Sequence, residues 1–200
     1  TAAAWGSSFI FLKQLTRFFT PFELTFLRYG LAGIFFWMIS WNTGSRIKMT
    51  WKDGMRLFFF SGLGIALSSI CAAFSMNWLT SSECGMMNST IPAITLLVER
   101  IVFGMRMKMN QVVAVVVSIL GVGLIGFSDL VLSFQPLGVG LMLLALVFWV
   151  TYGYGVQPLF DRYESRRLNT LQNCFAALFT MPFLWLIPYQ SSMWSRMADF

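Results

Sequence analysis

The chain has 200 residues; 57% of them are apolar, only 11% are charged, and phenylalanine alone occurs 21 times. A soluble domain carries roughly 25% charged residues because its surface faces water, so this composition excludes an ordinary soluble domain. The formal net charge of +6 would suit a nucleic-acid partner. The positions of the basic residues, given below, explain that charge as membrane topology instead, and we expect no nucleic-acid partner.

Seven apolar segments follow one another along the chain, and each is long enough to cross a bilayer as a helix. A spanning helix needs about 20 apolar residues at a rise of roughly 1.5 Å per residue. Backbone groups in hydrocarbon need internal partners, which favours helix for every segment. The predicted fold class is therefore all-α, a polytopic integral membrane protein. The segments run to about residue 19 and then over 21–41, 57–79, 82–103, 111–127, 138–160 and 171–189.

Basic residues gather on alternate links between these segments. Besides Lys13 and Arg28, which lie inside segments, and besides Arg17 and Arg196, every basic residue falls on the second, fourth or sixth link. By the positive-inside rule these three links are cytoplasmic, and the N-terminus is then cytoplasmic as well. The residues concerned are Arg46, Lys48, Lys52, Arg56, Arg100, Arg106, Lys108, Arg162, Arg166 and Arg167.

Side chains typical of catalysis and metal binding are scarce. The chain has no histidine, which removes the usual catalytic base and the commonest metal ligand. Cys71, Cys84 and Cys174 lie in or beside apolar segments without the spacing of a metal site. We expect neither an enzyme nor a bound cofactor or metal.

The start of the chain matches a later part at one constant shift, which indicates an internal repeat. The matched pairs are Trp5 with Trp149, Leu15 with Leu159, Leu24 with Leu168, Ala32 with Ala176 and Phe35 with Phe179. An odd number of helices separates the copies, so they lie in opposite orientations, as in many secondary transporters. We therefore predict a first repeat over residues 1–127 and the start of a second, inverted repeat over 138–200.

Several short motifs occur in a specific order along nearly the whole chain. They are Trp5-Gly6-Ser7-Ser8 with Lys13, Thr20-Pro21 with Leu27-Arg28, Pro92, Phe103-Gly104, Leu120-Gly121-Val122-Gly123 and Trp149. This order resembles the EamA-type branch of the drug/metabolite transporter superfamily. The resemblance implies ten helices arranged as five plus five, about seven of which are present here, so that the chain would lack the last helices. Met105 stands where that family usually has glutamate.

Lys13 and Arg28 are candidate substrate-binding residues because they place charge inside apolar segments. Such charge costs roughly 2.5–3.5 kcal/mol on insertion scales and tends to face a cavity or a partner. The alternative is that both side chains extend to the outer headgroups, with Glu23 as a counter-ion. At the repeat shift they align with Gln157 and Gln172, so the second copy keeps polarity there without charge.

Asn88, Thr90 and Pro92 form a second candidate group in the middle of the fourth segment. Proline supplies no N–H, so the carbonyl of Asn88 loses its helical donor, which suits a bend that lines a polar cavity. A proline kink satisfied by neighbouring helices is the alternative.

Trp5, Ser8, Trp149 and Tyr152 lie on the two repeat-related helices that border the central pathway in the resembled family. Large aromatic rings there could stack on an organic substrate, and ordinary packing is the alternative.

The function predicted from these features is a secondary transporter of small organic solutes in the cell membrane, working by alternating access. By resemblance the solutes would be amino acids, metabolites or drug-like compounds, with export as the expected direction. The expected partners are a small-molecule substrate and the lipid bilayer, and a homo-oligomer is left open. The alternatives are a polytopic membrane protein without transport activity, either an intramembrane enzyme or a seven-helix receptor.

Overall fold

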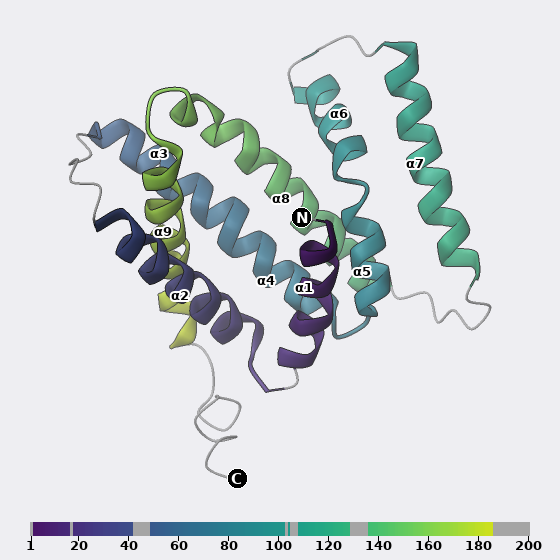
Figure 1. Ribbon diagram of the computed structural model, residues 1–200. Coiled ribbons are helices and arrows are strands. Elements are labelled where there is room, and N and C mark those ends of the chain that lie inside the picture. Colours follow the sequence, from purple (N-terminus) through teal and green to yellow (C-terminus); the bar gives the residue numbers. More distant parts are fainter. Residues whose placement is uncertain are drawn as a thin grey trace.

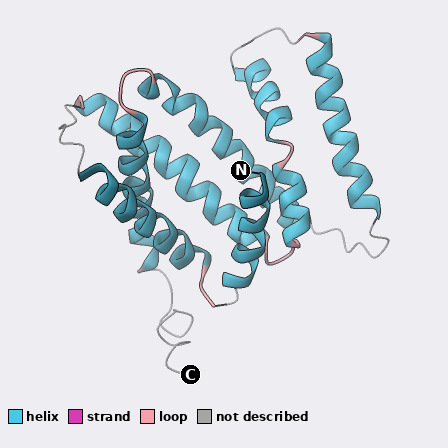
Figure 2. Ribbon diagram, viewed as in Figure 1, coloured by secondary structure: helices cyan, strands magenta, loops and turns pink. Residues whose placement is uncertain are grey.

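The computed structural model describes residues 2–16, 18–41, 49–102, 104, 108–128 and 136–185, and all regular structure within these ranges is helical (Figure 2). The predicted all-α class is thus confirmed. Three helical stretches are long and apolar enough to cross a membrane by length and composition, namely Pro21–Ile39, Trp51–Ser75 and Pro136–Phe160. Some basic residues used above lie outside the described ranges: Arg17, Arg46, Lys48, Arg106 and Arg196.

Each of the seven predicted segments forms helix (Figure 1). The helices are α1 (Ala2–Leu15), α2 (Pro21–Trp41), α3 (Trp51–Ser61), the π-helix η1 (Gly62–Leu67), α4 (Ser68–Ser75), α5 (Ser81–Asn88), α6 (Ile91–Val102), α7 (Met109–Ser128), α8 (Pro136–Phe160) and α9 (Ser165–Leu184). The third segment comprises α3, η1 and α4 in one continuous stretch, whereas the fourth is divided into α5 and α6.

Two helices, α3 and α9, begin about two turns earlier than the apolar segments predicted, because polar first turns extend them. α3 begins at Trp51, where the Thr50 side chain caps the helix by accepting from the backbone N–H of Asp53. α9 begins at Ser165, directly after its N-cap Glu164. Hydropathy marks only the apolar part of a helix, whereas at α3 a polar capping residue marks the start; the Glu164 side chain makes no such bond at α9. Of the last predicted segment, residues 186–189 lie outside the described ranges.

Contacts between distant segments bring links together at two ends of the bundle. At one end, Asp53 of α3 accepts a hydrogen bond of 2.8 Å from the Tyr163 hydroxyl and lies 3.9 Å from Arg162. At the other end, Lys13 donates to the backbone carbonyl of Leu79 at 2.9 Å. The start of α3 therefore lies beside the α8–α9 link, and the end of α1 lies beside the α4–α5 link.

α2 packs along α9 in the most extensive helix contact of the described fold, and the two run antiparallel. The Phe22 ring, near the start of α2, stacks on Phe183, near the end of α9, at 5.7 Å between centroids. Further along α2, a Cβ built on Gly33 would lie 3.0 Å from the Cys174 sulfur. The two helices that the repeat shift relates are thus in direct contact.

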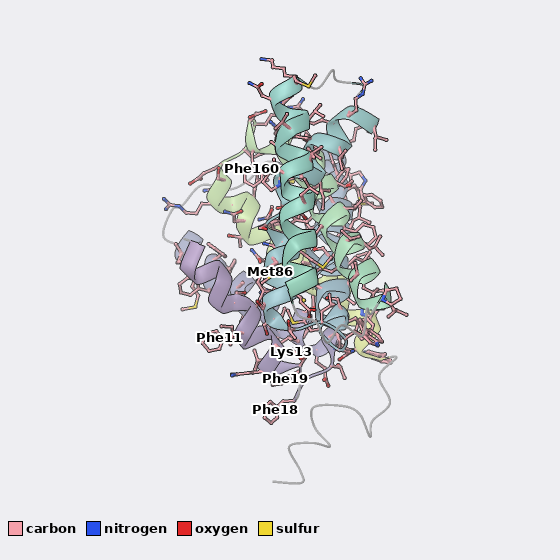
Figure 3. The ribbon with its side chains drawn as sticks, turned by 90° about the vertical axis from the view of Figure 1, so that its right-hand side faces the viewer. Phe11, Lys13, Phe18, Phe19, Met86 and Phe160 are labelled. Carbon is pink, nitrogen blue, oxygen red and sulfur yellow. The ribbon has the colours of Figure 1, made fainter. Side chains whose placement is uncertain are left out.

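α1 and α8 also run in opposite directions. In Figure 1, α1 descends from the N-terminus while α8 rises toward the loop before α9. Figure 3 shows Phe18 and Phe19, which follow α1, at one end of the bundle and Phe160, the last residue of α8, toward the other. This is the relation that an inverted pair of helices requires.

The outer surface of the bundle is apolar, whereas several polar side chains are buried. Large side chains such as Phe11, Leu31 and Phe35 are more than 60% exposed, and Figure 3 shows Phe11 projecting away from the bundle. Buried hydroxyls instead bond carbonyls one turn earlier in their own helices, as Thr180 does to Ala176 at 2.6 Å. Extensive exposed apolar surface marks a protein or membrane contact, and here it suits a surrounding bilayer.

The π-helix η1 brings the long third segment very close to α8. A Cβ built on Gly64 would lie 1.8 Å from the Tyr152 Cβ, and one built on Gly155 of α8 would lie 2.3 Å from the Phe60 ring. Only hydrogen fits at these two positions. Close approach of this kind is how membrane helices pack when no water drives them together.

We expect Gly64→Ala to destabilise the protein by about 1–3 kcal/mol, because the added methyl group must displace Tyr152. Thermal unfolding of the full-length protein in detergent would measure this as a lowered midpoint. Gly153→Ala is the matched control, since a Cβ there meets no atom within 4 Å. An equal response of the two variants would contradict the close contact.

Candidate functional site

A cavity of about 240 Å³ lies between α1, α2, the η1–α4 stretch, α5, α8 and α9. Its volume is near the lower end of the roughly 300–1,000 Å³ that is usual for small-molecule pockets. Helices from both predicted repeats supply its wall. The lining residues are Ser8, Phe9, Leu12, Arg28, Tyr29, Ile65, Ser68, Ser69, Ala72, Asn88, Met142, Ala145, Leu146, Trp149, Tyr152, Gln172 and Asn173.

The lining contains positions that the repeat shift relates to one another. Ser8 corresponds to Tyr152, Arg28 to Gln172, and Tyr29 to Asn173, and all six residues border the cavity. Because α1 and α8 run in opposite directions and α2 and α9 cross antiparallel, equivalent residues of the two copies face the same space. The cavity therefore lies at the seam between the two predicted repeats.

Hydrogen bonds hold the polar part of the wall in place. The Tyr152 hydroxyl donates to Gln172 Oε1 at 2.5 Å, and Gln172 Nε2 donates to Asn169 Oδ1 at 2.7 Å. In the same wall, the Tyr29 hydroxyl and Ser69 Oγ lie 2.6 Å apart. These bonds connect α8 to α9 and α2 to α4, so the polar groups are oriented before any solute enters.

Aromatic rings form another part of the wall. The Trp149 and Tyr152 rings lie 5.5 Å apart between centroids at an interplanar angle of 42°. Tyr152 is buried and packs in the core cluster with Leu57, Ile65 and Val156. Aromatic faces of this kind accommodate the apolar body of an organic ligand.

Arg28 contributes the positive charge of the wall. Its guanidinium carbon lies 5.4 Å from the centre of the Tyr29 ring. Among the described residues no aspartate or glutamate lies within 4 Å of the guanidinium, and none lines the cavity. Glu23, the counter-ion considered from the sequence, accepts from both the backbone N–H and the hydroxyl of Thr20 at 2.8 Å, closing the first turn of α2.

The structure brings five of the nine predicted site residues to this cavity, namely Ser8, Arg28, Asn88, Trp149 and Tyr152. Thr90 and Pro92 do not line it. The helix stops at Asn88 and a new helix starts at Ile91, so Pro92 lies in the first turn of α6. N–H groups in a first turn have no acceptor within the helix, so the proline costs no helical hydrogen bond there. The Thr90 hydroxyl donates to the Met87 carbonyl at 2.6 Å. The side chain of Trp5 lies outside the described residues.

Lys13 also lies away from the lining residues and caps a helix instead. Its ammonium group donates to the backbone carbonyls of Met76 and Leu79, directly after the last residue of α4, Ser75. Carbonyls at the end of a helix have no partner in the helix itself, and a cation there also interacts favourably with the helix dipole. A half-buried charge thus connects α1 to α4.

Sequence reasoning did not propose Tyr29, Ser69, Gln172 and Asn173, although all four line the cavity. The repeat shift was a usable signal for two of them, because it relates Tyr29 to Asn173 and both stand beside the pair of Arg28 and Gln172. Within the described residues, no group of three or more His, Cys, Asp or Glu side chains could hold a metal ion.

The antiparallel apolar helices around a shared cavity define a multi-pass helical membrane protein with the architecture of a transporter. A model of the EamA-like transporter family matches residues 1–127. Since this match covers more than half of the chain, the chain belongs to the EamA-like transporter family.

One relative among the curated proteins gives the same indication. An uncharacterized transporter of Archaeoglobus fulgidus is 24% identical over 184 residues, which cover 92% of this chain and 64% of that protein. The chain thus spans less than two thirds of the length of this relative. No solved structure matches the chain. Both matches point to a membrane transporter and not to an enzyme.

We expect Lys13→Met to lower the free energy of unfolding by about 1–2 kcal/mol, because the end of α4 loses a charged donor. Thermal unfolding in detergent measures the loss, and Lys52→Met, an exposed residue in the first turn of α3, is the control. Solute uptake per folded molecule should stay unchanged. Uptake lost without a change of stability would instead make Lys13 a substrate ligand.

Proposed function

We propose that this chain is the greater part of a secondary transporter that carries small organic solutes across the cell membrane by alternating access. Amino acids, related metabolites and drug-like compounds are the proposed substrates, and export is the proposed direction. The observation that supports this proposal is the cavity between the antiparallel helices α1 and α8, which is lined by three pairs of residues that the repeat shift relates.

The arrangement of the helices supports the mechanism. Residues 1–127 and 138–200 are proposed as the first repeat and the start of the second. Transporters with inverted repeats place the solute at the repeat interface, and one repeat then rocks against the other around that fixed point. Here the α2–α9 contact joins the copies, while the cavity occupies the space between them.

The charges of the links support one orientation in the membrane. Arg56 of α3 donates to the Gly155 carbonyl of α8 at 2.8 Å, and Arg162 pairs with Asp53, so two basic links meet at the same end. We propose that this end faces the cytoplasm, by the positive-inside rule, and that the N-terminus lies on the same side.

Trp149→Ala tests the cavity as the solute site. Loss of the indole face should reduce uptake of an organic substrate into vesicles roughly tenfold, because a large apolar side chain contributes about 1.5–3 kcal/mol when it is buried. Trp185→Ala is the control, since that side chain is 89% exposed at the end of α9. Unchanged uptake by the Trp149 variant would exclude this residue from the pathway.

A reporter fused after Tyr189 tests the orientation. With the N-terminus inside, seven helices place the reporter outside the cytoplasm. An enzyme that is active only in the cytoplasm should therefore give no signal there, while the same enzyme fused at residue 104, in the link after α6, should be active. A cytoplasmic signal after Tyr189 would rule out the topology and leave a receptor-like arrangement open.

A further inference from the structure

We infer that the cavity selects solutes that carry a carboxylate, and that Arg28 is the residue that selects them. This inference rests on the proposed function, because it names the chemical class of the substrate for the same site.

The first observation is the charge of the wall. Among the described residues, Arg28 is the one charged side chain that lines the cavity, and neither aspartate nor glutamate accompanies it. Arg28 lies within the candidate span Pro21–Ile39, eight positions into α2, so its charge stands about 10 Å along the helix axis from the start of the span. A cation at that depth attracts an anion and repels a second cation.

The second observation is the geometry of the donors. A guanidinium presents N–H groups in a planar fork that matches the two oxygens of a carboxylate. The Tyr29 ring, oriented by the hydrogen bond between its hydroxyl and Ser69, lies against one face of the Arg28 guanidinium. The Arg28 side chain is exposed and lines the cavity, so its N–H groups are accessible to a carboxylate there.

The third observation is what surrounds the charge. The remaining wall consists largely of aromatic and aliphatic side chains, including Trp149, Tyr152 and Leu146, and the cavity holds about 240 Å³. Such a wall accommodates the apolar body of a small molecule while the arginine binds its charged end. The class of substrate that follows is a small organic acid with an apolar or aromatic body.

The position on α9 that is equivalent to Arg28 carries no charge, so only the α2 side of the cavity can attract a carboxylate by charge. Gln172 occupies the position equivalent to Arg28, but its amide is already bonded to Tyr152 and Asn169. A neutral amide at that position offers no charge to a carboxylate. The anion is therefore bound at the α2 side of the cavity.

Three probes of matched shape test the inference on the full-length protein: 3-phenylpropanoate, its neutral amide 3-phenylpropanamide, and the cation 3-phenylpropylamine. Binding to the purified protein in detergent is measured by calorimetry. The carboxylate should bind about tenfold more tightly than the amide, as expected for hydrogen bonds to a charged group, and the amine should bind most weakly. Equal affinity for the carboxylate and the amide would overturn the inference without any variant being needed.

Arg28→Gln copies the residue of the second repeat and should remove the preference. Carboxylate affinity should fall about tenfold, while amide affinity stays the same and shows that the variant is folded. Arg166→Gln, an exposed arginine at the start of α9, should change neither affinity. A preference for the carboxylate that persists in Arg28→Gln would overturn the assignment to this residue.

Uptake into vesicles separates this inference from the proposed function. If the purified protein prefers the carboxylate but vesicles take up none of the probes, transport fails and the selectivity stands. If vesicles take up the amide and the carboxylate equally, transport stands and the selectivity fails.

Discussion

The fold depends on one constraint, which is that polar groups inside a bilayer must find partners within the protein. Most buried hydroxyls meet it by bonding carbonyls in their own helices, as Thr25 does to Pro21 at 2.7 Å, whereas Ser61 Oγ is buried without a hydrogen-bond partner among the described residues. Lys13 meets it by capping the end of α4. The apolar side chains are left to face outward, where phenylalanine and leucine are widely exposed. Other polar side chains, among them Ser8, Asn88 and Asn173, line the cavity between the helices.

Much of the helical framework could be predicted because a helix that spans a bilayer requires a long apolar segment, which is easy to recognise in a sequence. Long apolar segments, alternate basic links and the repeat shift all follow from the sequence, and all seven segments are helical in the described part of the chain. The first residue of a helix was harder to predict. Trp51 begins α3 well before the apolar run, because Thr50 and Asp53 form a capping pair that hydropathy does not register.

The site was predictable only in part, because its membership depends on contacts between distant segments. Arg28 was identified from its charge inside an apolar segment, and Trp149 from the repeat and the family resemblance; both line the cavity. Lys13 carries the same kind of signal but binds carbonyls more than 60 positions away, and no local pattern reveals such acceptors. Gln172 lacks charge, and in the sequence only the repeat shift that relates it to Arg28 indicated a role for it. Charge inside an apolar segment indicates an unusual role but does not distinguish a cap from a ligand.

The π-helix between α3 and α4 has a consequence for the comparison of related chains. A hydrogen bond between residues i and i+5 encloses one more residue in its ring than the i to i+4 bond of an α-helix, so Gly62–Leu67 contains extra backbone within an otherwise α-helical segment. A relative in which the segment equivalent to α3, η1 and α4 is α-helical throughout would be one residue shorter over this segment. An alignment without a single-residue gap there would place a different residue of the relative opposite Gly64, the glycine that contacts Tyr152. That glycine would then look variable although it is only shifted by one position.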